Sequence, residues 1–195
     1  MSILKEFNLS TQPQFLQGTK VMQAGGPKVR MYNSVLPDVG SWFALLELGW
    51  TLSKLEKLAA KVNILDPYRG KNGLELDAVT VHGWLKNHTR YVAVRDVITA
   101  AFRCTFGVET SQMSMLYFLT VSKSAGGVEK LFEATEGAGQ EFTVENGTAS
   151  IVDRLAKDIE KDVNILLDQA VNTVEQNDDG SVCILSGAGR IIRCR

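Results

Sequence analysis

One stretch of this sequence decides how its fold is interpreted, the segment Ser111–Ala156, which reads SQMSMLYFLTVSKSAGGVEKLFEATEGAGQEFTVENGTASIVDRLA. It begins with an apolar run, Met113–Val121, that predicts a helix. The Gly126-Gly127 pair ends this helix, because glycine adopts left-handed backbone conformations that cost other residues energy. Farther on, Gln140–Val144 predicts a short strand and Asn146–Thr148 opens another helix.

The sequence before this stretch predicts a block of helices with short connections between residues 41 and 134. Its clearest helix spans Ser41 to about Lys61, and two more are expected from Asp77 to Lys86 and from about Tyr91 to Phe106. Earlier still, two alternating runs around Gly25-Gly26-Pro27 predict a β-hairpin. We expect the apolar stripe of the first helix to be core, with a partner-binding groove as the alternative; it consists of Trp42, Leu45, Leu46, Leu52, Leu55, Leu58 and Val62.

The sequence after Gly139 has a different pattern, in which short strands surround one helix from Thr148 to Lys161. Gly187–Gly189 is interpreted as a hairpin turn and not as a nucleotide-binding loop, because the third glycine of GxGxxG is missing. Strands are predicted at Phe142–Val144, Val163–Leu167, Val171–Gln176, Ser181–Leu185 and Arg190–Cys194. A helical block followed by such a segment predicts an α/β (α+β) fold that ends in a β-meander.

Composition narrows the classes of function. The chain has 195 residues, of which 45% are hydrophobic and 22% charged, and a net charge of -1 gives no reason to expect nucleic acid or an anionic membrane as a partner. The three cysteines are widely spaced and suit a reducing compartment. His82 and His88 are expected on helix surfaces, and no metal-ligand pattern surrounds them. We expect neither a signal peptide nor a membrane-spanning segment in this chain, and it carries no serine-, cysteine- or metal-hydrolase motif.

The quoted stretch resembles the flavin-containing amine oxidases, the monoamine oxidase family. Members of that family carry an LYFL…K..GG helix, an apolar pair, and then GGAQE, F, V and GG-T/S in this order, and a hairpin similar to the one at residues 20–32 precedes their first long helix. The resemblance covers roughly residues 19–195. Two departures are visible: Asn146 replaces a glycine, and the region Gly137–Gly139 carries one extra residue. Asparagine tolerates left-handed backbone, so the turn at Asn146 is expected to survive.

The resemblance implies an enzyme that uses FAD to take hydride from the carbon next to an amine nitrogen. The imine then hydrolyses to an aldehyde, and oxygen is reduced to hydrogen peroxide. It also implies a division into an N-terminal lead at residues 1–18, a part of the substrate domain at residues 19–139, and a central piece of the FAD-binding domain at residues 140–195. The FAD site is then incomplete in this chain, and we expect the chain alone to be inactive.

The resemblance also assigns site residues. Gln140 matches the family's active-site glutamine, and the apolar pair at the cavity entrance matches Leu131 and Phe132. Cys104 and Thr105, with Ala101 one helical turn earlier, fall where the family lines its cavity wall. Val171 matches the strand residue whose backbone touches the adenine end of FAD. No catalytic or metal-binding residue is assigned, and each named residue has a structural alternative: a strand-end glutamine, ordinary core positions, or an ordinary strand residue.

Two functional hypotheses remain open. The first is the central part of a flavin amine oxidase that acts on a small amine, with oligomerisation possible. The second is a non-catalytic remnant that acts, if at all, as an interaction module. The expected location is intracellular, either cytoplasmic or at the mitochondrial outer membrane if a missing C-terminal part carries an anchor. The identity of the amine and the covalent or non-covalent state of the flavin are left open by the sequence.

Overall fold

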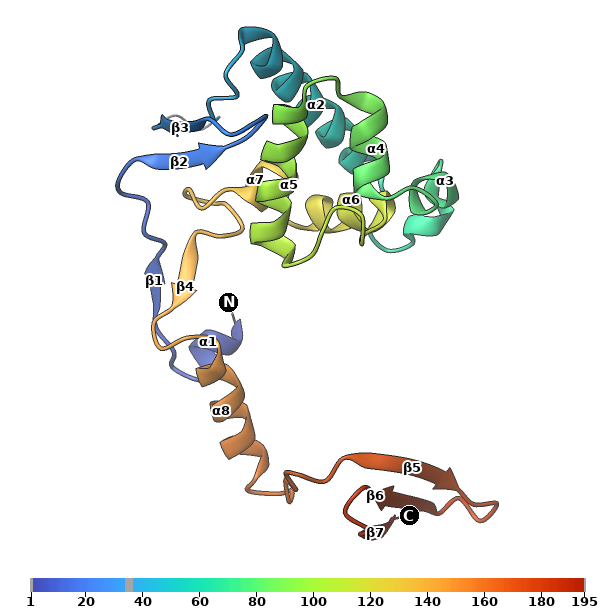
Figure 1. Cartoon of the computed structure of the whole chain (residues 1–195). Coiled ribbons are helices and arrows are strands. Elements are labelled where there is room, and N and C mark those ends of the chain that lie inside the picture. The colour runs from blue at the N-terminus through green and yellow to red at the C-terminus, as the bar shows by residue number, and fades with distance from the viewer. Residues whose placement is uncertain (1, 34–36, 195) are drawn as a thin grey trace. The chain divides into compact units, whose positions relative to one another are not determined.

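The computed structural model describes residues 2–33 and 37–194. The chain divides into two compact units: the larger is Thr11–Thr143, and the smaller combines the two ends of the chain, Met1–Ser10 and Val144–Arg195. Helices dominate the larger unit, and the smaller one holds one longer helix and a small sheet (Figure 1). Because the larger unit continues to Thr143, Gln140 belongs to it. The assignment of substrate and FAD-binding domains stays a prediction.

The helical block of the larger unit confirms most of the predicted helices. Its elements are α2 (Trp42–Lys61), η1 (Pro67–Arg69), α3 (Gly73–Asp77), α4 (Val81–His88), α5 (Val92–Phe106), α6 (Met115–Ser124) and α7 (Val128–Phe132). Helix α2 packs against α5, α6 and α7. The largest fully buried side chains of the block are those of Phe102, Phe118, Leu48, Leu55 and Leu85. Burial of these apolar surfaces is the main force that holds the block together.

The buried stripe of α2 differs from the predicted one. The residues that face the core are Ala44, Leu48, Thr51, Leu55 and Ala59. Leu55 and Val62 are buried as predicted, but Trp42, Leu45 and Leu46 are 66%, 36% and 52% exposed. The prediction placed the largest apolar side chains of α2 in the core. In the structure, the face that packs closely against the neighbouring helices is instead the one that contains two alanines. The interpretation of Trp42, Leu45 and Leu46 as core was therefore wrong.

The predicted hairpin is confirmed as β2 (Lys20–Gln23) and β3 (Val29–Tyr32), which pair antiparallel with Gln23 opposite Val29. Its turn is held on α5, because the Gly25 N–H donates to Asp96 Oδ2 at 2.8 Å. Gly25 has a φ of +70°, and a Cβ at this position would lie 2.6 Å from the Cβ of Ala93. Only glycine fits this close approach without strain.

One predicted helix begins later in the structure than the sequence indicated. The sequence predicted a short helix from its cap Asp77 to Lys86, and the structure forms it as α4, which begins at Val81 after the separate helix α3 ends at Asp77. Thr80 forms an isolated bridge with Ser114, and its Oγ1 accepts from the Gly83 N–H at 3.1 Å, which caps α4. The bridge keeps Thr80 extended and so sets the later start of α4, a long-range contact that local sequence does not reveal.

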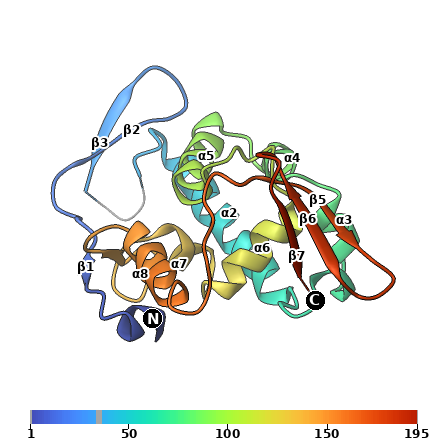
Figure 2. The ribbon, with the colours of Figure 1, turned by 90° about the horizontal axis from the view of Figure 1, so that it is seen from below.

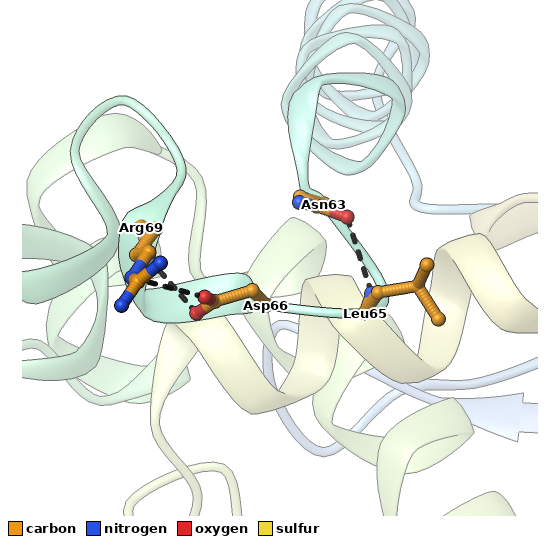
Figure 3. Close-up of polar contacts among 4 residues, drawn as sticks. All are labelled: Asn63, Leu65, Asp66 and Arg69. Atoms are coloured by element: carbon orange, nitrogen blue, oxygen red, sulfur yellow. Dashed lines mark hydrogen bonds and ion pairs between the residues drawn. The ribbon is translucent and has the colours of Figure 1, made fainter.

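The connection between α2 and α3 is ordered by short-range polar contacts (Figure 3). Asn63 Oδ1 accepts from the Leu65 N–H at 3.2 Å. Asp66 accepts from the Arg69 N–H at 3.4 Å and pairs with the Arg69 Nε at 3.2 Å. Asp66 thereby caps the single turn of η1, as short polar side chains do at helix N-termini.

The remaining elements of the ends are short. Helix α1 (Ser2–Glu6) was not predicted, and β1 (Thr11–Pro13) pairs with β4 (Phe142–Val144), which confirms the strand predicted there. Helix α8 (Ala149–Ile159) and the antiparallel order of β5 (Val171–Gln176), β6 (Val182–Ser186) and β7 (Ile191–Cys194) confirm the predicted helix and meander. Figures 1 and 2 both show the three strands side by side. Arg195 lies outside the described residues.

The strand predicted at Val163–Leu167 was wrong. The structure forms no strand there, and Val163 and Leu167 are 55% and 79% exposed. Its β-branched and apolar composition suggested a buried strand, but no neighbouring strand of the described sheet pairs with it.

Candidate functional site

The centre of the candidate site is the side chain of Gln140, which is half-buried in the larger unit. Its Nε2 donates to Thr105 Oγ1 at 3.0 Å and to the carbonyl oxygen of Leu131 at 3.2 Å. The structure therefore joins three of the residues that the sequence assigned, from α5, α7 and the segment before β4.

Hydrogen-bond chemistry fixes the orientation of the Gln140 amide. The backbone carbonyl of Leu131 can only accept a hydrogen bond, so the amide atom 3.2 Å away from it must be the nitrogen. The same nitrogen faces the Thr105 hydroxyl. The carbonyl oxygen Oε1 of Gln140 is then the group of this amide that remains available to a ligand.

The segment that carries Gln140 folds back on α7 through its main chain. The Gly139 N–H donates to the Lys130 carbonyl at 2.7 Å, and the Gln140 N–H donates to the Glu133 carbonyl at 3.2 Å. Carboxylates of the same segment are occupied by local donors: Glu141 Oε2 accepts from the Gly137 N–H at 2.8 Å and Glu133 Oε2 from the Thr135 hydroxyl at 2.9 Å. These contacts hold the backbone of Gln140 in place.

Helix α7 is itself fixed by a side chain of α2. Glu56 Oε1 accepts from the Glu129 N–H in the first turn of α7 at 2.9 Å. A negative charge at a helix N-terminus is favourable, because the unpaired N–H groups there carry partial positive charge. Gly127 precedes the helix with a φ of +133°, and a Cβ there would lie 3.0 Å from both Glu56 oxygens. The double-glycine break predicted from the sequence thus makes room for this carboxylate.

An aromatic cluster of the core lies next to these helices. The ring centroids of Phe102 and Phe106 on α5 are 4.6 Å apart, and those of Phe106 and Phe118 are 6.1 Å apart. Phe132 stacks on Phe118 with a centroid distance of 6.0 Å and an interplanar angle of 21°. Sequence reasoning did not assign Phe106 and Phe118 to the site, although Phe106 directly follows Thr105. The spacing of four between Phe102 and Phe106 was the available signal.

The side chains of the assigned residues other than Gln140 and Thr105 differ in burial. Leu131 is only 8% exposed and belongs to the hydrophobic core, whereas Phe132 is partly buried and packs against it. On α5, Ala101 is half-buried and Cys104 is exposed. Val171 is 59% exposed and lies in the smaller unit, on a strand at the edge of its sheet. The functional roles of these residues stay predictions.

A cavity of about 500 Å³ lies elsewhere in the larger unit, between the end of α2, the η1–α3 segment and α6. None of the assigned site residues lines it; its lining includes Leu58, Lys61, Lys71, Leu76 and Leu116. This cavity is therefore separate from the Gln140 cluster.

The histidines and acidic residues form no metal site within residues 2–33 and 37–194. His88 stacks on Trp84 with ring centroids 4.2 Å apart, and its Nδ1 lies 2.8 Å from the Trp84 carbonyl. Because a carbonyl accepts, this nitrogen carries the proton.

In the part of the chain that the structure describes, no helix combines the length and apolar character needed to cross a bilayer.

The sequence predicted a contact between Val171 and a flavin nucleotide. Val171 begins edge strand β5, next to an irregularity in its pairing with β6, so a backbone contact from this exposed position is sterically open. A phosphate cradle in this type of fold needs a strand, a glycine-rich turn and a helix in succession. The described helices and strands provide no such unit. A backbone contact from Val171 to a dinucleotide stays a prediction, and the described residues do not form a phosphate cradle of this type.

Comparison with known proteins shows which family this chain is similar to. A family model described as "Flavin containing amine oxidoreductase" matches residues 1–195. A Mycobacterium tuberculosis protein assigned to the flavin-containing monoamine oxidases is 27% identical over 190 residues, which covers 97% of this chain and 40% of that protein. Among solved structures, putrescine oxidase bound to putrescine matches with a TM-score of 0.82 and 21% identity over 99% of this chain and 42% of that one. Cyclohexylamine oxidase from Brevibacterium oxydans matches with a TM-score of 0.81 and 25% identity over 100% of this chain and 42% of that one.

The chain therefore belongs to the flavin-containing amine oxidoreductase family, as the resemblance in its sequence indicated. It spans about 40% of the length of the curated relative quoted above. The mixture of helices and small antiparallel sheets is the fold of the matching part of these oxidases.

Proposed function

We propose that residues 1–195 act within an FAD-dependent amine oxidase, which oxidises a small amine to an imine and then an aldehyde while oxygen is reduced to hydrogen peroxide. The observation that carries this proposal is the Gln140 amide, held by Thr105 and Leu131 at the meeting point of α5 and α7. Family membership supports the reaction class. The chain covers 40% of the length of its Mycobacterium tuberculosis relative. We use the term complete enzyme for a polypeptide of about that relative's length that would contain these residues.

The residues of this chain would bind and orient the amine. Gln140 supplies one uncharged polar group, and the partly buried rings of Phe106 and Phe132 are proposed to supply apolar surface, supported from behind by the fully buried Phe102 and Phe118. An apolar site favours the neutral amine over the ammonium ion, since desolvation penalises the charged form. Phe132 is proposed at the entrance, and Ala101, Cys104 and Thr105 at the wall. Leu131 contributes through its carbonyl, while its side chain supports the core.

Bound FAD would supply the hydride acceptor and pass electrons to oxygen. Val171 is proposed to contact the adenine end through its backbone, which agrees with its exposed position on an edge strand. The rest of the nucleotide would be held by parts of the complete enzyme outside these residues.

An interaction module is the alternative, and a specific observation favours it. Trp42, Phe43, Leu46 and Trp50 of α2 are 66%, 65%, 52% and 55% exposed. Exposed aromatic residues gathered on one helix are typical of surfaces that other structure covers. Under this alternative the chain binds a partner and oxidises nothing.

One experiment separates the two functions. The complete enzyme is purified, its flavin absorbance is recorded, and peroxide release is measured with a panel that includes putrescine, cyclohexylamine and aromatic monoamines. We expect a yellow protein that releases peroxide with at least one amine. A colourless protein that stays inactive with added FAD would contradict the oxidase proposal and favour the interaction module.

A further inference from the structure

The Gln140–Thr105 contact has a chemical consequence for ligand binding. A primary amide carries two N–H donors and one carbonyl acceptor. Its nitrogen donates to Thr105 Oγ1 at 3.0 Å and to the Leu131 carbonyl at 3.2 Å, so both donors are used inside the protein. Within the part of the chain that the structure describes, no hydrogen bond engages Oε1. The amide therefore presents an acceptor.

An acceptor is the group that suits an amine about to be oxidised. A neutral amine has N–H donors and one nitrogen lone pair. A donor from the protein would occupy the lone pair, which the oxidation of the adjacent carbon needs. A carbonyl oxygen instead holds the N–H and leaves the lone pair free.

We propose that Thr105 is a positioning residue, which fixes the Gln140 amide so that its carbonyl oxygen accepts the N–H of the amine substrate. This inference rests on the proposed amine oxidase function. The Gln140 nitrogen has two acceptors, and only the Thr105 hydroxyl can be removed by a substitution, because the other acceptor is the main-chain carbonyl of Leu131. Thr105 lies in the last turns of α5, a 15-residue helix whose core face includes the fully buried Phe102. The hydroxyl is thus carried by a rigid element.

The first experiment observes the amide itself in the chain of residues 1–195, labelled with ¹⁵N at the glutamine side chains. We expect the Gln140 side-chain protons to exchange with water more slowly than those of exposed Gln17. Thr105→Val removes the acceptor while keeping the shape of the side chain, and should accelerate the exchange. Thr99→Val, a half-buried threonine on the same helix, is the matched control and should leave it unchanged. Equal exchange for Gln140 and Gln17 in the unmodified chain would overturn the proposal.

The second experiment measures the kinetics of the complete enzyme with a primary amine and its N,N-dimethyl analogue, at a pH above the pKa of both amines. The neutral dimethyl analogue has no N–H to donate. Thr105→Val should lower kcat/KM for the primary amine about 2- to 10-fold, the effect of one hydrogen bond, and should leave the dimethyl analogue nearly unchanged. Thr105→Ser keeps the hydroxyl and should restore the wild-type value. In the Gln140→Ala background, Thr105→Val should have no further effect, because it acts through that amide.

The experiments distinguish a failure of the proposed oxidase function from a failure of the proposed positioning role of Thr105. A complete enzyme that binds no flavin and oxidises neither amine would refute the oxidase function, while the exchange experiment would still decide whether Thr105 holds the amide. An active enzyme in which Thr105→Val slows both amines equally would refute the acceptor role of Gln140. Persistence of the full Thr105→Val effect in the Gln140→Ala background would show that Thr105 acts without Gln140.

Discussion

The joint between α2 and α7 gives a quantitative test of how the site is positioned. Glu56 Oε1 accepts from the Glu129 N–H at 2.9 Å, and this is the contact from α2 to the first turn of the helix that carries Leu131. Replacing Glu56 by alanine leaves that N–H without its charged partner. A hydrogen bond to a charged group contributes about 1.5–3 kcal/mol to stability. Because Glu56 is half-exposed and solvent screens its charge, we expect Glu56→Ala to cost about 1–2 kcal/mol.

The assay is urea unfolding of residues 1–195 followed by tryptophan fluorescence. All three tryptophans lie in α2 and α4, so the signal reports on the larger unit. Glu56→Gln keeps an acceptor oxygen and should lose less than Glu56→Ala. The exposed neighbour Lys57 provides the matched control, and Lys57→Ala should stay within about 0.5 kcal/mol of the wild type.

A second variant checks the same joint from the other side. Gly127→Ala places a Cβ 3.0 Å from both Glu56 oxygens at a φ of +133°. It should be destabilising by about 1–3 kcal/mol from backbone strain, and part of that loss should disappear in the double variant with Glu56→Ala. A Glu56→Ala variant as stable as Lys57→Ala, or simple addition of the two losses at Glu56 and Gly127, would contradict a role of Glu56 in holding α7.

Three further predictions concern the entrance, a turn and the isolated chain. Phe132→Ala in the complete enzyme should raise activity toward bulky amines relative to small ones; a stability loss of about 3–5 kcal/mol with unchanged preference would instead identify Phe132 as plain core. The Ser181 hydroxyl and N–H donate hydrogen bonds to Asp179 and hold the pKa of its carboxyl below the ordinary value. The stability that this turn gains is therefore present above the unfolded-state pKa of Asp179 and is lost as pH falls through its folded-state pKa. An NMR titration of the Asp179 carboxyl checks the direction, and an unshifted pKa would contradict it. Residues 1–195 alone should neither retain FAD nor oxidise amines, and a yellow, active preparation would disprove this.

Local patterns predicted the elements that local interactions determine. The hairpin around Gly25, helix α5 and the β5–β6–β7 meander all follow from periodicity and turn residues, and the structure confirms them. Long-range contacts explain the failures. The Thr80–Ser114 bridge delays the start of a predicted helix. In α2, packing against the neighbouring helices buries Ala44 and Ala59 in place of larger side chains.

In the candidate site, too, local sequence indicated single residues, whereas the contacts between them depend on the fold. The family motif indicated Gln140, Thr105 and Leu131 as separate positions, but only the folded chain shows that a single amide nitrogen connects them. Glu56 was not predicted at all, since nothing in its own helix marks it as the cap of α7. Contacts between residues 73 positions apart are set by helix packing.

The central claim is that Gln140 orients the amine in the oxidase site, and the most direct measurement is the kcat/KM of Gln140→Ala in the complete enzyme. Loss of one orienting hydrogen bond predicts a decrease that corresponds to about 1–3 kcal/mol, with the fold and flavin content unchanged. Gln17→Ala, which removes an exposed glutamine of the same unit, should match the wild type. Wild-type kinetics for Gln140→Ala in an enzyme with full flavin content would contradict the account.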